Sequence, residues 1–171
     1  SAAAQAGAPD AAPRLLTLLA TEDVPAWRAT LLLLARGQAA THPPVLTAAR
    51  AALRDPDPLV RSAAVQVLGT TPAETAALRP MLDDPTRLVR LDAAWLLSAE
   101  LPANSTTRRE LDAYLATAAD QPAGRLRLAQ DLFNRGRIAE AEAPLRLAVT
   151  WDPNSPVIHA TLGTVLNAAT E

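Results

Sequence analysis

Hydrophobic residues recur every four positions between residues 58 and 68, which is the spacing of one face of an α-helix. Two such rows run through this segment: Leu59, Ala63, Val67 and Val60, Ala64, Leu68. Residues 69–72 break the pattern with Gly, two Thr and Pro, and a shorter apolar stretch begins near Ala73. This pattern predicts a helical hairpin with a long first helix and a short second one.

The dipeptide Asp55-Pro56 stands just before the first predicted helix of this hairpin. An aspartate at this place accepts hydrogen bonds from the free N–H groups of the first turn, and proline is tolerated there. We therefore expect Asp-Pro to open the helix. The neighbouring carboxylates do not follow the spacing of a calcium-binding loop, so we interpret them as helix caps.

The same hairpin pattern occurs again 29 positions later. Asp55-Pro56-Asp57-Pro58-Leu59-Val60-Arg61 aligns with Asp84-Pro85-Thr86-Arg87-Leu88-Val89-Arg90. In a weaker, earlier copy, Ala26-Trp27-Arg28 aligns with Leu59-Val60-Arg61. Each hairpin of such an array buries its apolar face only against its neighbours, so we predict a stack of hairpins.

These residues resemble HEAT repeats, in particular the short HEAT-like repeats also found in phycobilin lyases, between about Ala12 and Leu101. The resemblance implies an α-solenoid and a ladder of Asp55, Arg61, Asp84 and Arg90 between neighbouring repeats. An alternative for the arginines is a ridge that binds carboxylates or phosphates. The repeat serves many unrelated roles, so it implies little about function.

After Gln121 the repeat changes to a 34-residue step that places Pro122 on Pro156 and Leu128 on Leu162. Gly136 lies between two predicted helices, and Ala141, Ala148 and Pro153 follow it. These positions resemble a tetratricopeptide repeat, although Arg125 and His159 stand where that family usually has Trp. We expect one such unit, followed by a first helix that either caps the stack or begins another unit.

The fold class that we predict is all-α, an α-solenoid in which HEAT-like hairpins continue into a tetratricopeptide unit. We expect residues 1–11 to be a disordered or tag-like N-terminus and residues 12–103 to hold the HEAT-like repeats. Residues 104–121 should form a joining helix, and residues 122–171 a tetratricopeptide unit plus a capping helix. The composite also resembles the C-terminal tail of some bacterial multihaem cytochromes, without their Cys-x-x-Cys-His motifs.

Composition excludes several function classes. The chain of 171 residues has a net charge of −2, so it lacks the basic excess of a general nucleic-acid binder. It contains no Cys, which excludes disulfides, zinc-thiolate sites and covalently attached haem. All 16 basic residues are Arg, and with abundant Ala and Pro this is typical of a high-GC bacterial genome. We expect a bacterial protein of the cytoplasm or periplasm, with the periplasm favoured, and no membrane span.

Little in the chain supports catalysis. The two histidines, His42 and His159, fall in different repeat types, and neither has the neighbours of a catalytic or metal site. Trp27 and Trp95 lie within first-helix patterns, so we expect both in the core, and we expect Trp151 at the junction between tetratricopeptide units. We predict no enzyme activity, no catalytic residue, no cofactor and no metal.

The function that remains is a noncatalytic protein-protein interaction scaffold with a concave solenoid surface. The first helix of a tetratricopeptide unit lines that surface, so the candidate peptide-binding residues are Arg125, Arg127, Gln130, Asn134 and His159. An equally good interpretation is that these residues are simply solvated and bind no peptide. The alternative function is an accessory C-terminal repeat domain of a larger bacterial enzyme or of an extracytoplasmic multihaem electron-transfer protein.

Overall fold

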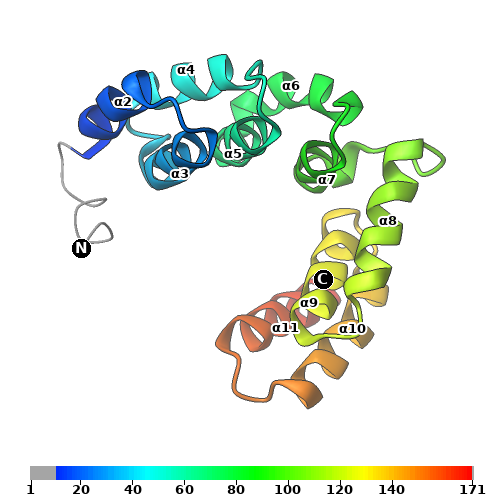
Figure 1. Cartoon of the computed structure of the whole chain (residues 1–171). Helices are drawn as coiled ribbons and strands as arrows, with labels where there is room; N and C mark the ends of the chain where they lie inside the picture. The colour runs from blue at the N-terminus through cyan, green and yellow to red at the C-terminus, as the bar shows by residue number, and fades with distance from the viewer. Residues whose placement is uncertain (1–10, 171) are drawn as a thin grey trace. The chain divides into compact units, whose positions relative to one another are not determined.

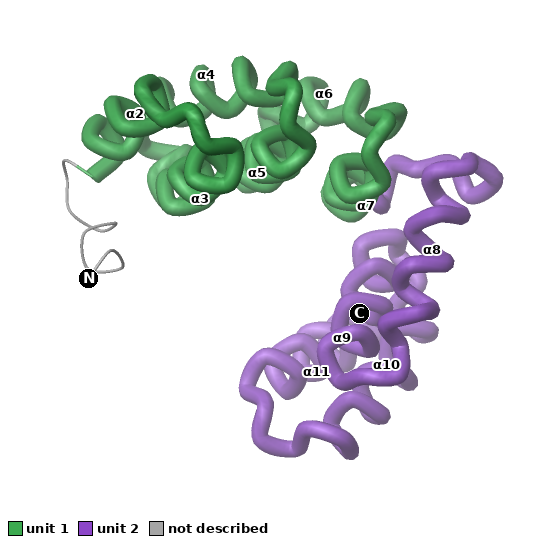
Figure 2. Tube along the Cα trace, in the orientation of Figure 1, with its two compact units in different colours: residues 1–97 green, residues 98–171 purple. Residues whose placement is uncertain are grey.

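The computed structural model describes residues 11–170, and this part of the chain contains helices and no strand. The predicted all-α class is confirmed. Two compact units follow one another along the chain, Ser1–Leu97 (unit 1) and Ser98–Glu171 (unit 2), coloured separately in Figure 2. The predicted disordered or tag-like N-terminus lies outside the described residues, except that Ala11 begins the first described helix.

Unit 1 consists of helical hairpins whose helices form two layers (Figure 1). The first-layer helices are α3 (Pro25–Ala35), α5 (Pro58–Leu68) and α7 (Arg87–Leu96), and α5 packs against both of the others. The second-layer helices are α2 (Ala11–Thr21), α4 (Pro43–Ala52) and the short α6 (Thr75–Leu78). Three 3₁₀ helices complete the connections: η1 (Arg36–Gln38), η2 (Pro72–Glu74) and η3 (Arg79–Asp83). This arrangement confirms a helical-repeat solenoid.

Helix α5 begins at Pro58, so Asp57-Pro58 opens it, and the expectation for Asp55-Pro56 is wrong by two residues. Asp57 is the N-cap, and its carboxylate accepts a hydrogen bond of 2.8 Å from the N–H of Leu59. The carboxylate of Asp55 instead accepts from the N–H of Asp57 at 2.9 Å. Asp84 accepts in the same way from the N–H of Thr86 at 2.8 Å. In both copies the first aspartate therefore shapes the loop before the helix.

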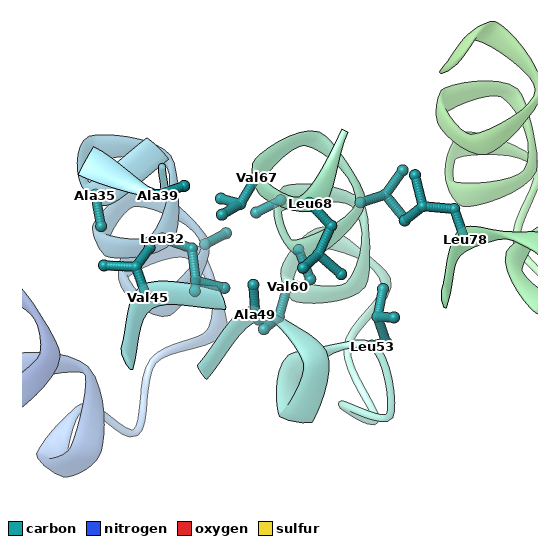
Figure 3. Packing of buried hydrophobic residues seen from close by; sticks show 14 of the residues in the cluster. Leu32, Ala35, Ala39, Val45, Ala49, Leu53, Val60, Val67, Leu68 and Leu78 are labelled. Atoms are coloured by element: carbon teal, nitrogen blue, oxygen red, sulfur yellow. The ribbon is translucent and has the colours of Figure 1, made fainter. Parts of the chain in front are cut away.

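The core of unit 1 consists mainly of Ala, Val and Leu side chains between the two layers. Figure 3 shows Leu32, Val60 and Leu68 among the buried side chains that gather there. Small side chains of this kind let helices approach closely. Trp95 is half-buried, but Trp27 is 61% exposed, so the expectation that Trp27 lies in the core is wrong.

Unit 2 contains the short 3₁₀ helix η4 (Ser98–Glu100) followed by α8 (Thr106–Ala118), α9 (Pro122–Asn134), α10 (Ile138–Trp151) and α11 (Pro156–Ala168). Ser105 caps α8, since its hydroxyl accepts a hydrogen bond of 3.1 Å from the N–H of Arg108. Gly136 joins α9 to α10 with a positive φ of 72°, a conformation that favours glycine. Helix α10 packs against both α9 and α11.

The core of unit 2 includes two alanines of the 34-residue pattern. Ala141 and Ala148 on α10 are both 0% exposed, and they pack with Ala129 of α9 and Val165 of α11. The predicted boundaries at residues 103 and 121 stay predictions. The division after Leu97 groups residues by contact, and it does not distinguish one repeat type from another.

Candidate protein-binding surfaces

The predicted peptide-binding residues of α9 do not share one surface. Arg127 is exposed, and its Nη1 donates a hydrogen bond of 2.7 Å to the hydroxyl of Tyr114 on α8. The guanidinium of Arg125 instead lies 5.5 Å from the centre of the Trp151 ring on α10. Residues two positions apart project from different sides of a helix. The structure therefore directs these two arginines toward different neighbours.

The other three candidates also separate. Gln130 is half-buried and Asn134 is exposed, and their spacing from Arg127 puts these three residues on one side of α9. His159 is exposed on α11, where its Nε2 lies 2.8 Å from the carbonyl oxygen of Pro153. The resulting groups are Arg127, Gln130 and Asn134 on α9, the stacked pair of Arg125 and Trp151, and His159 against its own loop. Their role in binding stays a prediction.

Arginine-carboxylate pairs connect neighbouring hairpins in unit 1, as the implied ladder requires. Arg61 of α5 donates from Nε to Asp84 Oδ2 at 2.7 Å and from Nη2 to Asp84 Oδ1 at 2.9 Å. One repeat earlier, Arg28 of α3 pairs with Asp55. Arg90 donates to the carbonyl oxygens of Asp84 at 2.8 Å and Pro85 at 3.0 Å. The structural interpretation of these arginines is confirmed.

The ladder arginine Arg61 also donates hydrogen bonds to backbone carbonyl groups of the loop before α5. Nη1 of Arg61 donates to the carbonyl oxygens of Asp55 at 2.8 Å and Pro56 at 3.0 Å. The hydrogen bonds from Arg61 lower the pKa of Asp84, although burial alone would raise that pKa. Asp84 therefore stays ionised to a lower pH than a free aspartate, and its charge stabilises the contact between α5 and the loop before α7.

A second pair, which the sequence pattern did not reveal, joins α4 to η2. Arg50 donates from Nε to Glu74 Oε2 at 2.7 Å, and its Nη2 bonds the other carboxylate oxygen. Hydrogen bonding to Arg50 lowers the pKa of Glu74. The two residues lie in different helical segments with no repeated spacing, so only the packing of α4 beside the next hairpin could reveal the pair.

An apolar groove lies between α2 and α4 in unit 1. Its volume is about 750 Å³, and its walls are mostly alanine, leucine and proline side chains such as Leu16, Leu19, Ala48 and Ala51. The charged residues in its lining, Arg28 and Asp55, pair with each other. An apolar concave surface of this size is a candidate ligand-binding site. The sequence does not reveal the groove, because its walls are ordinary positions on two helices.

A buried ion pair connects α8 to α9 in unit 2. Arg108 donates from Nη1 to Asp131 Oδ1 at 2.9 Å and from Nη2 to Asp131 Oδ2 at 3.1 Å. Both side chains are only 1% exposed. Burial lowers the pKa of Arg108, but its hydrogen bonds to Asp131 and Asp112 outweigh that effect and raise the pKa. The pair holds two helices together and leaves no surface for a ligand.

The histidines have local partners. His42 Nδ1 lies 3.0 Å from the hydroxyl of Thr41 in the turn before α4, in unit 1, whereas His159 belongs to unit 2. Within residues 11–170, no three His, Cys, Asp or Glu side chains are grouped to hold a metal ion. In the same residues, no helix is both long and apolar enough for a membrane span.

Comparison with known families finds a match over part of the chain. Residues 30–98 match the family model of HEAT repeats. The match runs from α3 to the first residue of η4, and it lies within the range that the sequence predicted for HEAT-like repeats. HEAT repeats generally serve as protein-interaction scaffolds, and the fold is typically noncatalytic. No curated protein and no solved structure matches the chain.

Proposed function

We propose that this protein is a noncatalytic scaffold that binds a protein partner through the apolar groove of unit 1. The HEAT-like repeats support a role in protein interaction. The groove itself is the observation that carries the proposal, because it is concave, mostly apolar and about 750 Å³ in volume. Its only charged lining residues neutralise each other, so it favours an apolar surface of the partner.

A bulky charge in the groove tests this proposal. Ala51 is exposed and lines the groove, so Ala51→Arg should fill the groove and leave the helix intact. Ala160→Arg on α11 is the matched control, since Ala160 is also exposed on a helix and belongs to unit 2. Partners are captured from the source cells by affinity purification. A partner lost with Ala51→Arg and retained with Ala160→Arg supports the groove, and equal capture by both variants contradicts it.

For residues 122–171 we propose a tetratricopeptide unit followed by a helix of the same kind. Three observations support it: the packing of α9 against α10, the positive φ of Gly136 and the complete burial of Ala141 and Ala148.

Replacing Ala148 with Phe should overpack the contact between α10 and its neighbours and destabilise unit 2 by about 1–3 kcal/mol. Ala143→Phe is the control, since Ala143 is exposed on the same helix. Equal unfolding free energies for the two variants would contradict this assignment.

The exposed side of α9 is a second binding surface in this proposal. Arg127 and Asn134 lie on that side, and Arg127 is oriented by its hydrogen bond to Tyr114. A double substitution of Arg127 and Asn134 by Ala should weaken capture of a partner that uses this side. If every partner is retained by the double variant, solvation is the correct interpretation of these residues.

The alternative function, an accessory repeat domain of a larger bacterial enzyme or multihaem protein, depends on the complete gene. Haem-binding motifs or a catalytic domain encoded upstream would support it. A gene that encodes only the repeats would contradict it.

A further inference from the structure

Arg28 lines the apolar groove of unit 1 and has the same repeat position as the ladder arginines Arg61 and Arg90. Arg61 donates to both carboxylate oxygens of Asp84, and its Nη1 donates to two carbonyl oxygens of the loop before α5. Those carbonyls belong to the residues six and five positions earlier in the chain. Nη1 of Arg90 donates to the two corresponding carbonyls of its own loop. The loop carbonyls are therefore regular acceptors of a ladder arginine.

Arg28 uses only part of its hydrogen-bonding capacity. Its Nη2 donates to Asp55, and within residues 11–170 this is its single hydrogen bond. The carbonyl groups of Glu22 and Asp23, which stand six and five residues before it, accept no hydrogen bond from it. The N–H groups on Nε and Nη1 of Arg28 therefore remain able to bind another acceptor.

The groove exposes the arginine of this pair and hides the aspartate. The side chain of Arg28 is 30% exposed, whereas that of Asp55 is 2% exposed. Both oxygens of Asp55 already accept hydrogen bonds, one from Arg28 and one from the N–H of Asp57. The hydroxyl of Thr47, the remaining polar side chain of the lining, donates to the carbonyl oxygen of Pro43. Of the lining side chains, all in the described part of the chain, Arg28 is thus the one with unused donors.

We propose that the groove binds an apolar segment of the partner protein that carries one carboxylate, and that this carboxylate pairs with Arg28. An occupant without an acceptor would bury the unused N–H groups of Arg28, which costs binding free energy. A carboxylate is the acceptor that suits the site best. Its hydrogen bonds to arginine are charge-assisted, and the planar guanidinium matches its geometry.

Unit 2 contains an arginine that already binds two carboxylates in this way. Arg108 donates from Nη1 to Asp131 at 2.9 Å and from Nη2 to Asp112 at 2.5 Å. The side chain of Asp131 is 1% exposed, and that of Asp112 is 52% exposed. One guanidinium thus holds an enclosed carboxylate and an exposed one together. At Arg28, Asp55 is the enclosed carboxylate, and the partner would supply the exposed one.

This inference rests on the proposed function, because it names the chemistry of the partner at the same groove. The two can still fail separately. Ala51→Arg fills the groove and should exclude every occupant. Arg28→Gln leaves the apolar walls in place and should change only the preference for a carboxylate.

The probe is a displayed library of short random peptides, selected on the full chain and counter-selected on Ala51→Arg. Peptides that depend on the groove should share apolar residues and one Asp or Glu. Changing that residue to the matching amide should weaken binding to the unchanged chain about tenfold or more, because a charged hydrogen-bond partner is lost. Fluorescence anisotropy with the labelled peptides measures this loss, and it requires no change in the protein.

Arg28→Gln completes a double-mutant cycle with the acidic peptide and its amide form. If the pair forms, Arg28→Gln should bind both peptides equally weakly, because the two losses are not additive. Arg50→Gln is the matched control, since Arg50 also pairs with a carboxylate, that of Glu74, and does not line the groove. It should keep the full preference for the acidic peptide. Because Arg28→Gln leaves Asp55 buried without its arginine, the double variant with Asp55→Asn repeats the cycle without that charge.

Peptides that need the open groove but bind equally well as acid and as amide would overturn this inference and leave the proposed function standing. Additive losses in the cycle would also overturn it. A library without any groove-dependent peptide would count against both.

Two further results would assign the groove to another occupant and overturn the inference. A dimer of the chain in light scattering that Ala51→Arg dissociates would assign the groove to a second copy. Peptide binding that requires removal of residues 1–10, or that disappears in the complete product of the gene, would assign it to another segment of the same polypeptide. A monomer that binds the acidic peptide with these segments in place supports the partner carboxylate.

Discussion

The two units use arginine-carboxylate pairs in different ways. In unit 1 the pairs repeat with the hairpins, and each arginine retains some contact with solvent, as with Arg61, which is 11% exposed. In unit 2 one pair, Arg108 and Asp131, is completely enclosed between α8 and α9. A buried pair contributes little net stability over apolar side chains, but losing one partner is costly because the other charge remains buried. Unit 1 should therefore tolerate the loss of one pair better than unit 2.

The largest expected effect is in unit 2. Asp131→Ala leaves the buried Arg108 with Asp112 as its remaining carboxylate partner and should destabilise unit 2 by about 3 kcal/mol. Chemical denaturation followed by circular dichroism, with hydrogen exchange to resolve the two units, measures this. Replacing both residues with apolar ones, Arg108→Met with Asp131→Leu, should restore much of the loss. If the double variant is as unstable as Asp131→Ala, the loss comes from packing and not from the unpaired charge.

A smaller loss is expected in unit 1. Arg61→Ala removes the hydrogen bonds to Asp84 and to two loop carbonyls, and should lower the free energy of unfolding by about 1.5–3 kcal/mol. Arg54→Ala is the control, because Arg54 is an exposed arginine of the same unit. The comparison between the units would be wrong if Arg61→Ala cost more than Asp131→Ala.

The pH dependence of stability should report on the ladder of unit 1. Hydrogen bonding to Arg61 lowers the pKa of Asp84 in the folded protein, so its ionised form adds stability above the unfolded pKa. That stability is lost as the pH falls through the folded pKa. Asp84→Asn should therefore be less stable at neutral pH and should lose less stability in acid than the unchanged chain. Parallel acid-denaturation curves for the two would contradict this role of Asp84.

The smallest expected effect on stability comes from replacing glycines of unit 2 with alanine. A Cβ added at Gly163 in α11 meets no atom within 4 Å, so Gly163→Ala should stabilise the helix by about 0.5–1 kcal/mol. At Gly124 in α9 the added Cβ would lie 1.7 Å from the carbonyl oxygen of Ala118. Gly124→Ala should therefore separate α8 from α9 and weaken the contact that the Arg108 pair holds. Thermal melting of both variants measures the difference, and stabilisation by Gly124→Ala would show that this contact is loose.

Much of the fold could be predicted from local pattern. The recurrence of Asp-Pro and Val-Arg 29 residues apart predicted the hairpins of unit 1, because capping and helix periodicity depend on neighbouring residues. The 34-residue step likewise placed Gly136 between two helices. Pattern reasoning misplaced the start of α5, since an aspartate that shapes a loop and one that caps a helix look alike in sequence.

The candidate surfaces were less predictable. Trp27 has the same repeat position as the buried Val60, but it is 61% exposed. Arg125 and Arg127 are two residues apart in sequence, but they contact different helices. Arg127 bonds Tyr114 of α8, and Arg125 lies over the ring of Trp151 on α10. Pro144 lies inside α10 and is buried there, where local propensity alone would end the helix.

The sequence by itself determined the all-α class and the hairpin repeat. These follow from spacing, capping and composition, which act over a few residues and repeat with each hairpin. Tertiary structure alone decided which repeated positions are covered, how Arg108 reaches Asp131 and where α2 and α4 leave a groove. Burial depends on which helix lies alongside, and that neighbour is distant in the chain.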